Sequence, residues 1–248
     1  MTAYMPRSAR KAPGDIVFHV LNRGVGRREI FAADGDYAAF ERIVAEALER
    51  VPVRLLAYCL MPNHWHMVLW PRKDRQLGTF MQLLTTTHVR RWQEHRREVG
   101  WGHLYQGRFK SFPIQTDDHF LAVCRYVERN AMRAGLVRQA QDWRWSSLWR
   151  RERGAKEEKA ILAAWPVQRP SDWLERVNWP QTLAEEEALR LSVKRGRPYG
   201  DDVWQRRCAA ELGLESSLRA AGRPRKRKQK DTKETTLANA ANSRKVAK

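Results

Sequence analysis

Cysteine is scarce in this sequence, and the few cysteines stand far apart. The chain has three, at Cys59, Cys124 and Cys208, with no CxxC pair among them. A disulfide-stabilised scaffold needs cysteines at dense, paired spacings, and a thiolate zinc site needs closely spaced pairs. The sequence therefore argues against both classes of protein.

Long apolar runs are also missing. None approaches the ~20 residues that a membrane-spanning helix needs. The stretch from Met1 to Gly14 is polar and interrupted by Pro6 and Pro13, so it does not resemble a secretory signal. Apolar residues still make up 42% of the chain, enough for a packed core. We therefore expect a soluble, cytoplasmic protein with no membrane partner.

Acidic residues are few relative to basic ones. The 248-residue chain has 28 Asp and Glu against 47 Lys and Arg, a net charge of +19. Such a field favours a nucleic acid as partner; the alternative is a basic protein without one. Part of the charge lies in the far C-terminal stretch, where Gly222 to Lys230 reads GRPRKRKQK. With few large apolar side chains, that stretch is predicted to be a disordered tail that attracts phosphates without reading sequence.

Hydrophobic periodicity predicts an α+β fold for residues 1–150. Strands are expected at 15–22, 53–61, 64–70 and 108–115, and helices at 34–50, 76–99 and 117–133. The Pro62-Asn63 turn joins two strands into a hairpin, so the sheet should be antiparallel, with helices on one face. Pro113 suggests an edge strand. Residues 151–220 form a predicted helical extension with helices at 156–164, 182–193 and 201–212, and 221–248 is the basic tail.

Two histidines in the strand at 64–70 are candidate metal ligands. His64 and His66 are two residues apart, so their imidazoles point to the same face of the strand. Neighbouring imidazoles can chelate a divalent metal. On spacing alone the alternative is that they only make hydrogen bonds within a half-buried sheet.

A tyrosine and an asparagine on a later helix form the second candidate element. Tyr126 and Asn130 are four residues apart and lie on one helical face. Taken alone, Tyr126 would be a boundary tyrosine with a solvated hydroxyl. Taken with the histidines, it is a candidate nucleophile, because a metal can neutralise the oxygens of a phosphodiester that a tyrosine attacks. Two imidazoles and an amide oxygen would leave positions open for phosphate and water, with Mg²⁺ or Mn²⁺ as the metal.

Three segments resemble a known family in order and spacing. They are YCLMPNHWHMVLWP (Tyr58 to Pro71), YQGRFKSFPIQTDDHFLAVCRYVERNAMRAGLV (Tyr105 to Val137) and WRWSS (Trp143 to Ser147). This pattern resembles the REP-associated tyrosine transposases, a branch of the HUH single-strand DNA transposases that carries one catalytic tyrosine. The resemblance covers about residues 15–150.

The resemblance implies a fold, an activity and a site. The fold would be the HUH endonuclease fold, a ferredoxin-like α+β sheet with helices. His64 and His66 would hold a divalent metal, Asn130 would complete its site, and Tyr126 would be the nucleophile. The substrate would be single-stranded or hairpin DNA, a palindrome that is cleaved and rejoined through a 5′-phosphotyrosine. Ala131 stands where the family commonly has proline, which is a departure from the pattern.

Further residues are candidate DNA contacts. They are Asn22, Arg23, Arg108, Lys110, Arg125, Arg129, Arg133, Arg195 and Arg197. Asn22 and Arg23 resemble the family's NRG loop. Arg108 and Lys110 stand among aromatic residues, which suits contact with single-stranded DNA. Arg125, Arg129 and Arg133 would form a basic ridge that suits a row of phosphates. Arg195 and Arg197 lie in an Arg-Gly-Arg-Pro segment, which suits a narrow minor groove. The alternatives are an amphipathic strand, a solvated helix face and a plain linker.

Two other functions on DNA compete with a transposase, and a structural or ribosome-associated basic protein is the remaining alternative. The chain would be a domesticated hairpin-binding protein if its cleavage activity were weak or lost, although His64, His66, Tyr126 and Asn130 are all present. It would be a replication or conjugation initiator if it carried a helicase domain or a second nearby tyrosine, and neither is visible. We expect a monomer without an obligate protein partner, associated with the nucleoid in a bacterial cytoplasm.

Overall fold

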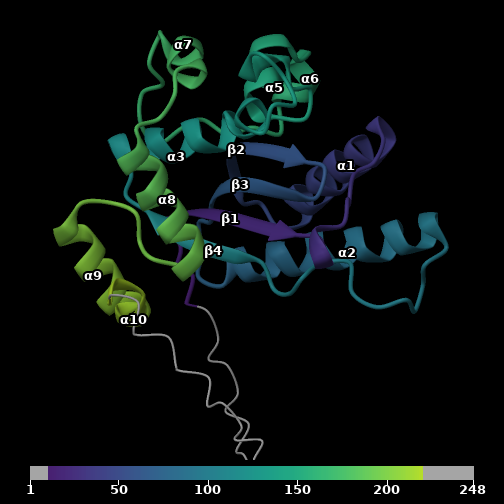
Figure 1. The fold of residues 1–248 in the computed structure, drawn as a ribbon. Helices are drawn as coiled ribbons and strands as arrows, with labels where there is room; N and C mark the ends of the chain where they lie inside the picture. Colours follow the sequence, from purple (N-terminus) through teal and green to yellow (C-terminus); the bar gives the residue numbers. More distant parts are fainter. Residues whose placement is uncertain (1–10, 220–248) are drawn as a thin grey trace, which may run out of the picture. The chain divides into compact units, whose positions relative to one another are not determined.

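The computed structural model describes residues 11–219, and its first half has the element order βαββαβ (Figure 1). The elements are β1 (Val17–Arg23), α1 (Asp34–Arg50), β2 (Arg54–Met61), β3 (His64–Trp70), α2 (Gln76–Arg96) and β4 (Lys110–Ile114). The strands form one sheet in the order β2-β3-β1-β4, and every neighbouring pair is antiparallel. This is the ferredoxin-like arrangement, so the predicted α+β fold is confirmed. Pro113 lies in β4, an edge strand, as predicted.

The second half is helical. Its elements are α3 (Asp118–Glu128), α4 (Asn130–Arg133), α5 (Ser147–Arg153), α6 (Lys156–Lys159), α7 (Trp173–Asn178), α8 (Leu183–Arg195), α9 (Asp202–Leu212) and α10 (Glu215–Leu218). The helix predicted at 117–133 is interrupted at Arg129. The helix predicted at 156–164 is wrong beyond its first turn, and α5 and α7 were not predicted.

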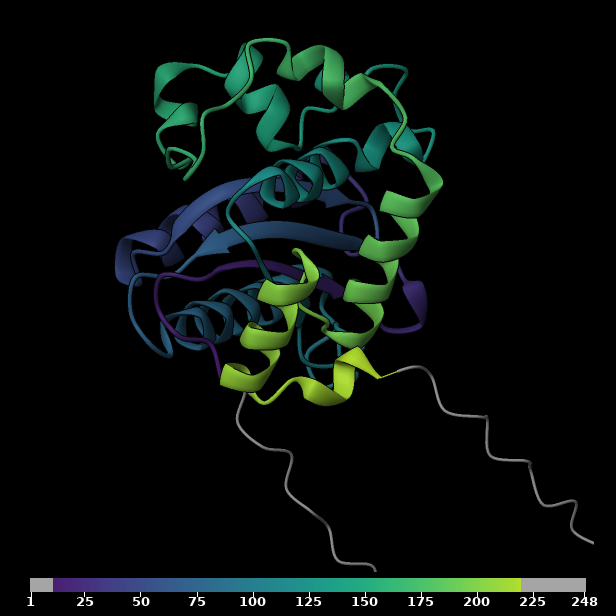
Figure 2. The ribbon, with the colours of Figure 1, turned by 90° about the vertical axis from the view of Figure 1, so that its left-hand side faces the viewer.

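Helices cover both faces of the sheet, so the expectation of helices on one face is wrong. Tyr58 and Leu60 of β2 belong to a core cluster with α1 and α2, whereas Cys59 and Met61 belong to a second cluster with α3. Figure 2 shows α2 and α3 on opposite sides of the sheet. The cause is visible in β2, where seven successive residues after Arg54 are buried. Because successive side chains point to opposite faces, such a strand needs cover on both faces of the sheet.

The later residues join the sheet at its β4 edge. The Tyr199 amide donates to the carbonyl of Pro113 (2.9 Å), and the Gln115 amide donates to the carbonyl of Tyr199 (2.9 Å). Residues 11–218 belong to one compact unit. The division of function at residue 150 stays a prediction, and the predicted tail, 221–248, lies outside the described residues. Between residues 11 and 219, no helix is long and apolar enough to cross a membrane.

A buried polar network joins α1, β2 and α5. The Tyr58 hydroxyl donates to Glu41 Oε1 (2.6 Å) and accepts from Arg150 Nε (2.7 Å). Arg150 Nη2 also pairs with Glu41 Oε2 at 2.7 Å. Burial, followed by the nearby Glu41 charge, raises the pKa of Tyr58 well above its ordinary value, so the phenol stays protonated. Each of the three groups depends on the other two, because all are buried.

Replacing Glu41 with alanine is expected to lower the free energy of unfolding by about 3–5 kcal/mol, because it leaves Arg150 buried without its partner. Urea unfolding measures the loss. Glu46→Ala is the matched control, because Glu46 pairs with Arg91 on the surface and its loss should change little. Equal effects from the two substitutions would contradict the assignment.

Candidate active site

The two histidines of β3 lie side by side, as their spacing predicts. The ring centroids of His64 and His66 are 5.1 Å apart. Their strand is internal: His66 stands opposite Leu21 of β1 and Cys59 of β2. Hydrogen-bonded neighbours on both sides make this strand a rigid base for the pair.

A third histidine, which the sequence analysis missed, supports the pair. His19 of β1 is 1% exposed, and its Nε2 lies 2.8 Å from Nδ1 of His66. Its ring stacks on Phe112 of β4, with centroids 4.7 Å apart. The alternation of side chains along the first strand predicts which face of that strand His19 lies on. Only the pairing register between the strands places it next to His66. Histidines that bind metals usually have the second ring nitrogen held by such a partner.

Burial keeps all three imidazoles neutral. It lowers the pKa of His19 to about 3. Burial, together with the positive charges of Arg23 and Arg133, lowers the pKa of His64 to about 4. It holds the pKa of His66 well below its ordinary value. Neutral imidazole is the form that binds a metal.

The hydrogen bonds of the pair leave the same atom available on each ring. Nδ1 of His64 lies 2.6 Å from Oδ1 of Asn63, and Nδ1 of His66 is held by His19. Nε2 of each ring is therefore the atom left for a ligand. In the described part of the chain, no group of three His, Cys, Asp or Glu side chains is arranged to hold a metal. The donor set predicted from the sequence, two imidazoles and the amide of Asn130, would suit a divalent ion with positions open for substrate.

Tyr126 lies beside this pair. Its ring centroid is 5.8 Å from that of His66 and 6.4 Å from that of His19, in both cases edge to face. Helix α3 brings it there. The Asp117 side chain caps the helix by accepting from the His119 amide. The structure thus brings the tyrosine to the histidines, as expected if they act together.

Asn130 lies near the tyrosine and contacts an arginine. Its Oδ1 accepts from Arg133 Nη2 (3.0 Å), and its buried Nδ2 has no partner within the described residues. The Arg133 guanidinium also lies 4.3 Å from the Tyr126 ring centroid. Arg133 is exposed, yet its guanidinium contacts both Asn130 and the Tyr126 ring. The amide oxygen has a second lone pair, so a metal on Asn130 would share this oxygen with Arg133, whose positive charge opposes a cation there.

The remaining predicted DNA contacts lie in four places. Arg23 stands opposite His64 in the β1–β3 pairing. Arg108 and Lys110 are exposed. Arg125 and Arg129 donate to backbone carbonyls near the end of α7. Arg195 donates to the Ser216 carbonyl and Arg197 to Gln205, so the Arg-Gly-Arg-Pro segment is packed into a turn.

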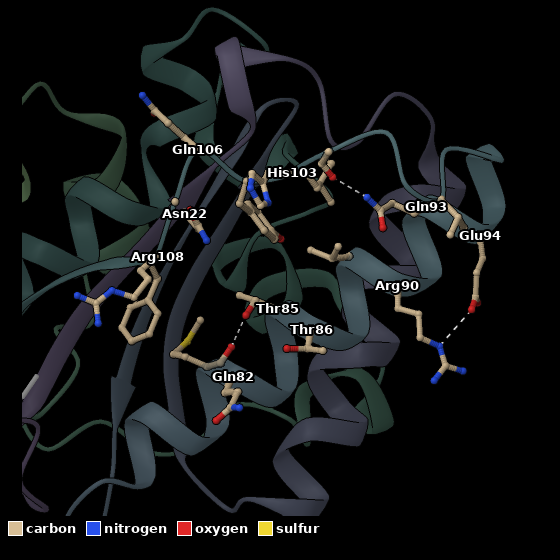
Figure 3. Close-up of a pocket in the computed structure, with 18 of the residues that line it drawn as sticks. Asn22, Gln82, Thr85, Thr86, Arg90, Gln93, Glu94, His103, Gln106 and Arg108 are labelled. Carbon is tan, nitrogen blue, oxygen red and sulfur yellow. Dashed lines mark hydrogen bonds and ion pairs between the residues drawn. The ribbon is translucent and has the colours of Figure 1, made fainter. Parts of the chain in front are cut away.

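Asn22 faces the opposite side of the sheet from the histidines. It lines a groove of about 1120 Å³ between α2 and residues 99–109, with Arg108 nearby (Figure 3). Its cross-strand partner is Trp65, which belongs to the core cluster under α1 and α2. Asn22 and Arg23 are adjacent in sequence, but strand alternation sends them to different faces.

Comparison with known proteins assigns most of the first half to one family. Residues 14–130 match the family described as "Transposase IS200 like". A protein of Haemophilus influenzae, assigned as a REP-associated tyrosine transposase, is 24% identical over 119 residues, which cover 45% of this chain and 68% of that protein. These matches confirm the resemblance found in the sequence.

Two solved structures are similar in part. One is described as a REP-associated tyrosine transposase bound to a REP hairpin, with a TM-score of 0.46 at 18% identity, covering 67% of this chain and 96% of the other. The second is a protein of Deinococcus radiodurans described as a transposase, with a TM-score of 0.36 at 17% identity. It covers 51% of this chain and 96% of the other.

Replacing His19 with phenylalanine is expected to weaken Mn²⁺ binding by about 10–100-fold, because His66 loses the partner that orients it. Isothermal titration with Mn²⁺ measures the change. His19→Gln should recover part of the affinity, since its amide offers a polar atom at a similar reach. Unchanged affinity in His19→Phe would show that the contact does not orient the ligand.

Proposed function

We propose that the protein is a metal-dependent single-strand DNA endonuclease and transposase, because residues 14–130 match the IS200-like transposase family. It binds a palindromic, REP-like hairpin, then cleaves and rejoins the strand through a 5′-phosphotyrosine on Tyr126. The observation that carries this proposal is the edge-on approach of Tyr126 to His66, 5.8 Å between centroids. The name of the Haemophilus influenzae relative supports the class of reaction and of DNA.

The chemistry follows from the groups in the site. The Tyr126 oxygen attacks phosphorus and loses its proton, the bond from phosphorus to the 3′ oxygen breaks, and that oxygen leaves as a hydroxyl. The new tyrosine phosphodiester conserves a bond of the same type, so a 3′-hydroxyl can reverse the step and rejoin DNA. A bound Mg²⁺ or Mn²⁺ on His64, His66 and Asn130 would neutralise the non-bridging oxygens. His19 holds His66 in orientation throughout.

Basic residues near the site supply contacts to the strand. Arg133 lies against the Tyr126 ring and is close enough to neutralise a phosphate on that tyrosine. Arg23 stands at the His64 end of the sheet, where the exposed Arg108 and Lys110 also lie on the adjoining strand and loop. These side chains form our proposed path for single-stranded DNA, and Asn22, on the other face of the sheet, stays a separate candidate contact.

One observation favours a second function, a domesticated hairpin-binding protein with weak or no cleavage. Arg133 donates to the Asn130 oxygen that would ligate the metal, and a guanidinium repels a cation. If the guanidinium kept a metal away when DNA was bound, the site would hold DNA without cutting it. The two functions differ in whether a covalent adduct forms.

Replacing Tyr126 with phenylalanine is expected to abolish the covalent protein–DNA adduct and leave hairpin binding within about twofold of the unaltered protein, because only the nucleophile is removed. The measurement is a denaturing gel on single-stranded palindromic oligonucleotides with Mn²⁺, Mg²⁺ or EDTA.

His64→Ala should also abolish the adduct, through loss of the metal, and EDTA should act likewise. Tyr105→Phe is a control for loss of a buried phenol outside the site, and should still form the adduct. Binding without cutting or adduct in the unaltered protein, with either metal, would support the hairpin-binding function instead.

The histidines and the tyrosine of one chain already lie together, so we propose that a monomer is active without a protein partner. Mixing Tyr126→Phe with His64→Ala is therefore expected to restore no adduct, since neither chain has a complete site. Recovery of activity in the mixture would show that the tyrosine serves a second copy. A chromosomal hairpin as substrate implies a cytoplasmic, nucleoid-associated protein, which stays a prediction.

A further inference from the structure

The outer side of α3 bears polar side chains that turn away from the site and toward α7. Arg125 Nη2 donates to the carbonyls of Trp179 (3.1 Å) and Pro180 (2.6 Å). Arg129 Nη1 donates to the carbonyls of Val177 and Asn178. Carbonyls in the last turn of a helix lack intrahelical donors, and a guanidinium near them is a favourable partner. Arg125 of α3 and Arg129, the residue that follows α3, therefore both bind residues 173–181, which we call the α7 segment.

A buried carboxylate makes a second connection on the same side. Glu128 is 0% exposed; one oxygen accepts from Ser147 Oγ (2.6 Å) and the other from Trp173 Nε1 (2.8 Å). It thus links α3 to the first residues of α5 and α7. A further hydrogen bond joins the other end of the α7 segment to α3: Gln181 Nε2 donates to the Ala122 carbonyl (3.1 Å).

Apolar packing fills the space between these polar contacts. Trp173 and Val177 of α7 and Leu189 of α8 belong to the same core cluster as Phe120 and Val127 of α3. Figure 1 shows α7 on the side of α3 away from the strands, and α8 running from α3 toward β4. Helix α3 therefore lies between the sheet and the α7 segment, and Tyr126 cannot move from His66 without disturbing both.

We propose that the α7 segment positions the nucleophile, with Arg125, Glu128 and Arg129 as positioning residues that act through α3 and not on DNA. This inference rests on the proposed function, because it concerns the reactivity of Tyr126. It assigns two arginines of the predicted basic ridge to the protein's own carbonyls. Misplacement of a reacting group by about 1 Å costs on the order of 100-fold in rate, so the support of α3 matters for the reaction.

The test is the double variant Arg125→Gln/Arg129→Gln. It is expected to form the Tyr126–DNA adduct at least about tenfold more slowly at saturating hairpin. Its Kd for the hairpin, and the salt dependence of that Kd, should stay as in the unaltered protein. If the two arginines contacted phosphates instead, Kd would rise and the salt slope would fall by about one per arginine. That result, or an unchanged rate, would overturn the proposal.

Arg176→Gln is the matched control. Arg176 lies on α7 itself but pairs with Asp172 on the surface, so its loss should leave the rate unchanged. Arg129→Lys should recover part of the rate, because an ammonium can still donate to the carbonyls. Trp173→Phe, which removes the donor to Glu128 and keeps most of the ring volume, should lower the rate without weakening hairpin binding.

Hydrogen exchange separates this proposal from the proposed function. In the DNA-free double variant, amides of residues 120–127 should exchange faster, while those of the four strands should not. Unchanged exchange in α3 would overturn the positioning role, even if the protein cleaves DNA. Faster exchange in a protein that forms no adduct would leave the support of α3 standing and refute the transposase.

Discussion

The antiparallel pairing of β1 with β3 is the constraint on which the site depends. It places His19 diagonally across from His66 and sets Arg23 opposite His64. A shift of one residue would turn every side chain of one strand to the other face. The register thus fixes both the orientation of His64 and His66 and the burial that keeps their imidazoles neutral. Each imidazole is held by both the backbone of its strand and a hydrogen bond at Nδ1.

The second constraint is that both faces of the sheet are apolar. Helices α1 and α2 cover one face, and the other face has to be covered by residues that come after β4 in the chain. Helix α3 provides that cover through Phe120, Cys124 and Val127, and the same packing brings Tyr126 to the histidines. Helix α3 therefore both packs against the sheet and positions Tyr126. Loosening its packing should lower the stability of the fold and also displace the tyrosine.

Local periodicity was enough for much of the fold and for part of the site. Alternation in the strand at 64–70 put both histidines on one face, and helical spacing put Tyr126 and Asn130 together. His19 was missed because it lies 47 residues from His66 in sequence and meets it only through strand pairing. The local pattern of a strand does not predict its register with a distant strand. Helix α7 was missed because six residues are too few for a periodic signal.

The arginines show most clearly why charge alone does not assign function. Arg125, Arg129 and Arg133 are spaced four apart and look equivalent in sequence, yet the structure gives them different partners. Two donate to carbonyls of the α7 segment, and the third donates to Asn130 and lies on the Tyr126 ring. A guanidinium has five donors and no acceptor, so a nearby helix end satisfies it as well as a phosphate does. Because α3 is interrupted at Arg129, Arg133 follows on a short separate helix, and only this arginine turns toward the reacting groups.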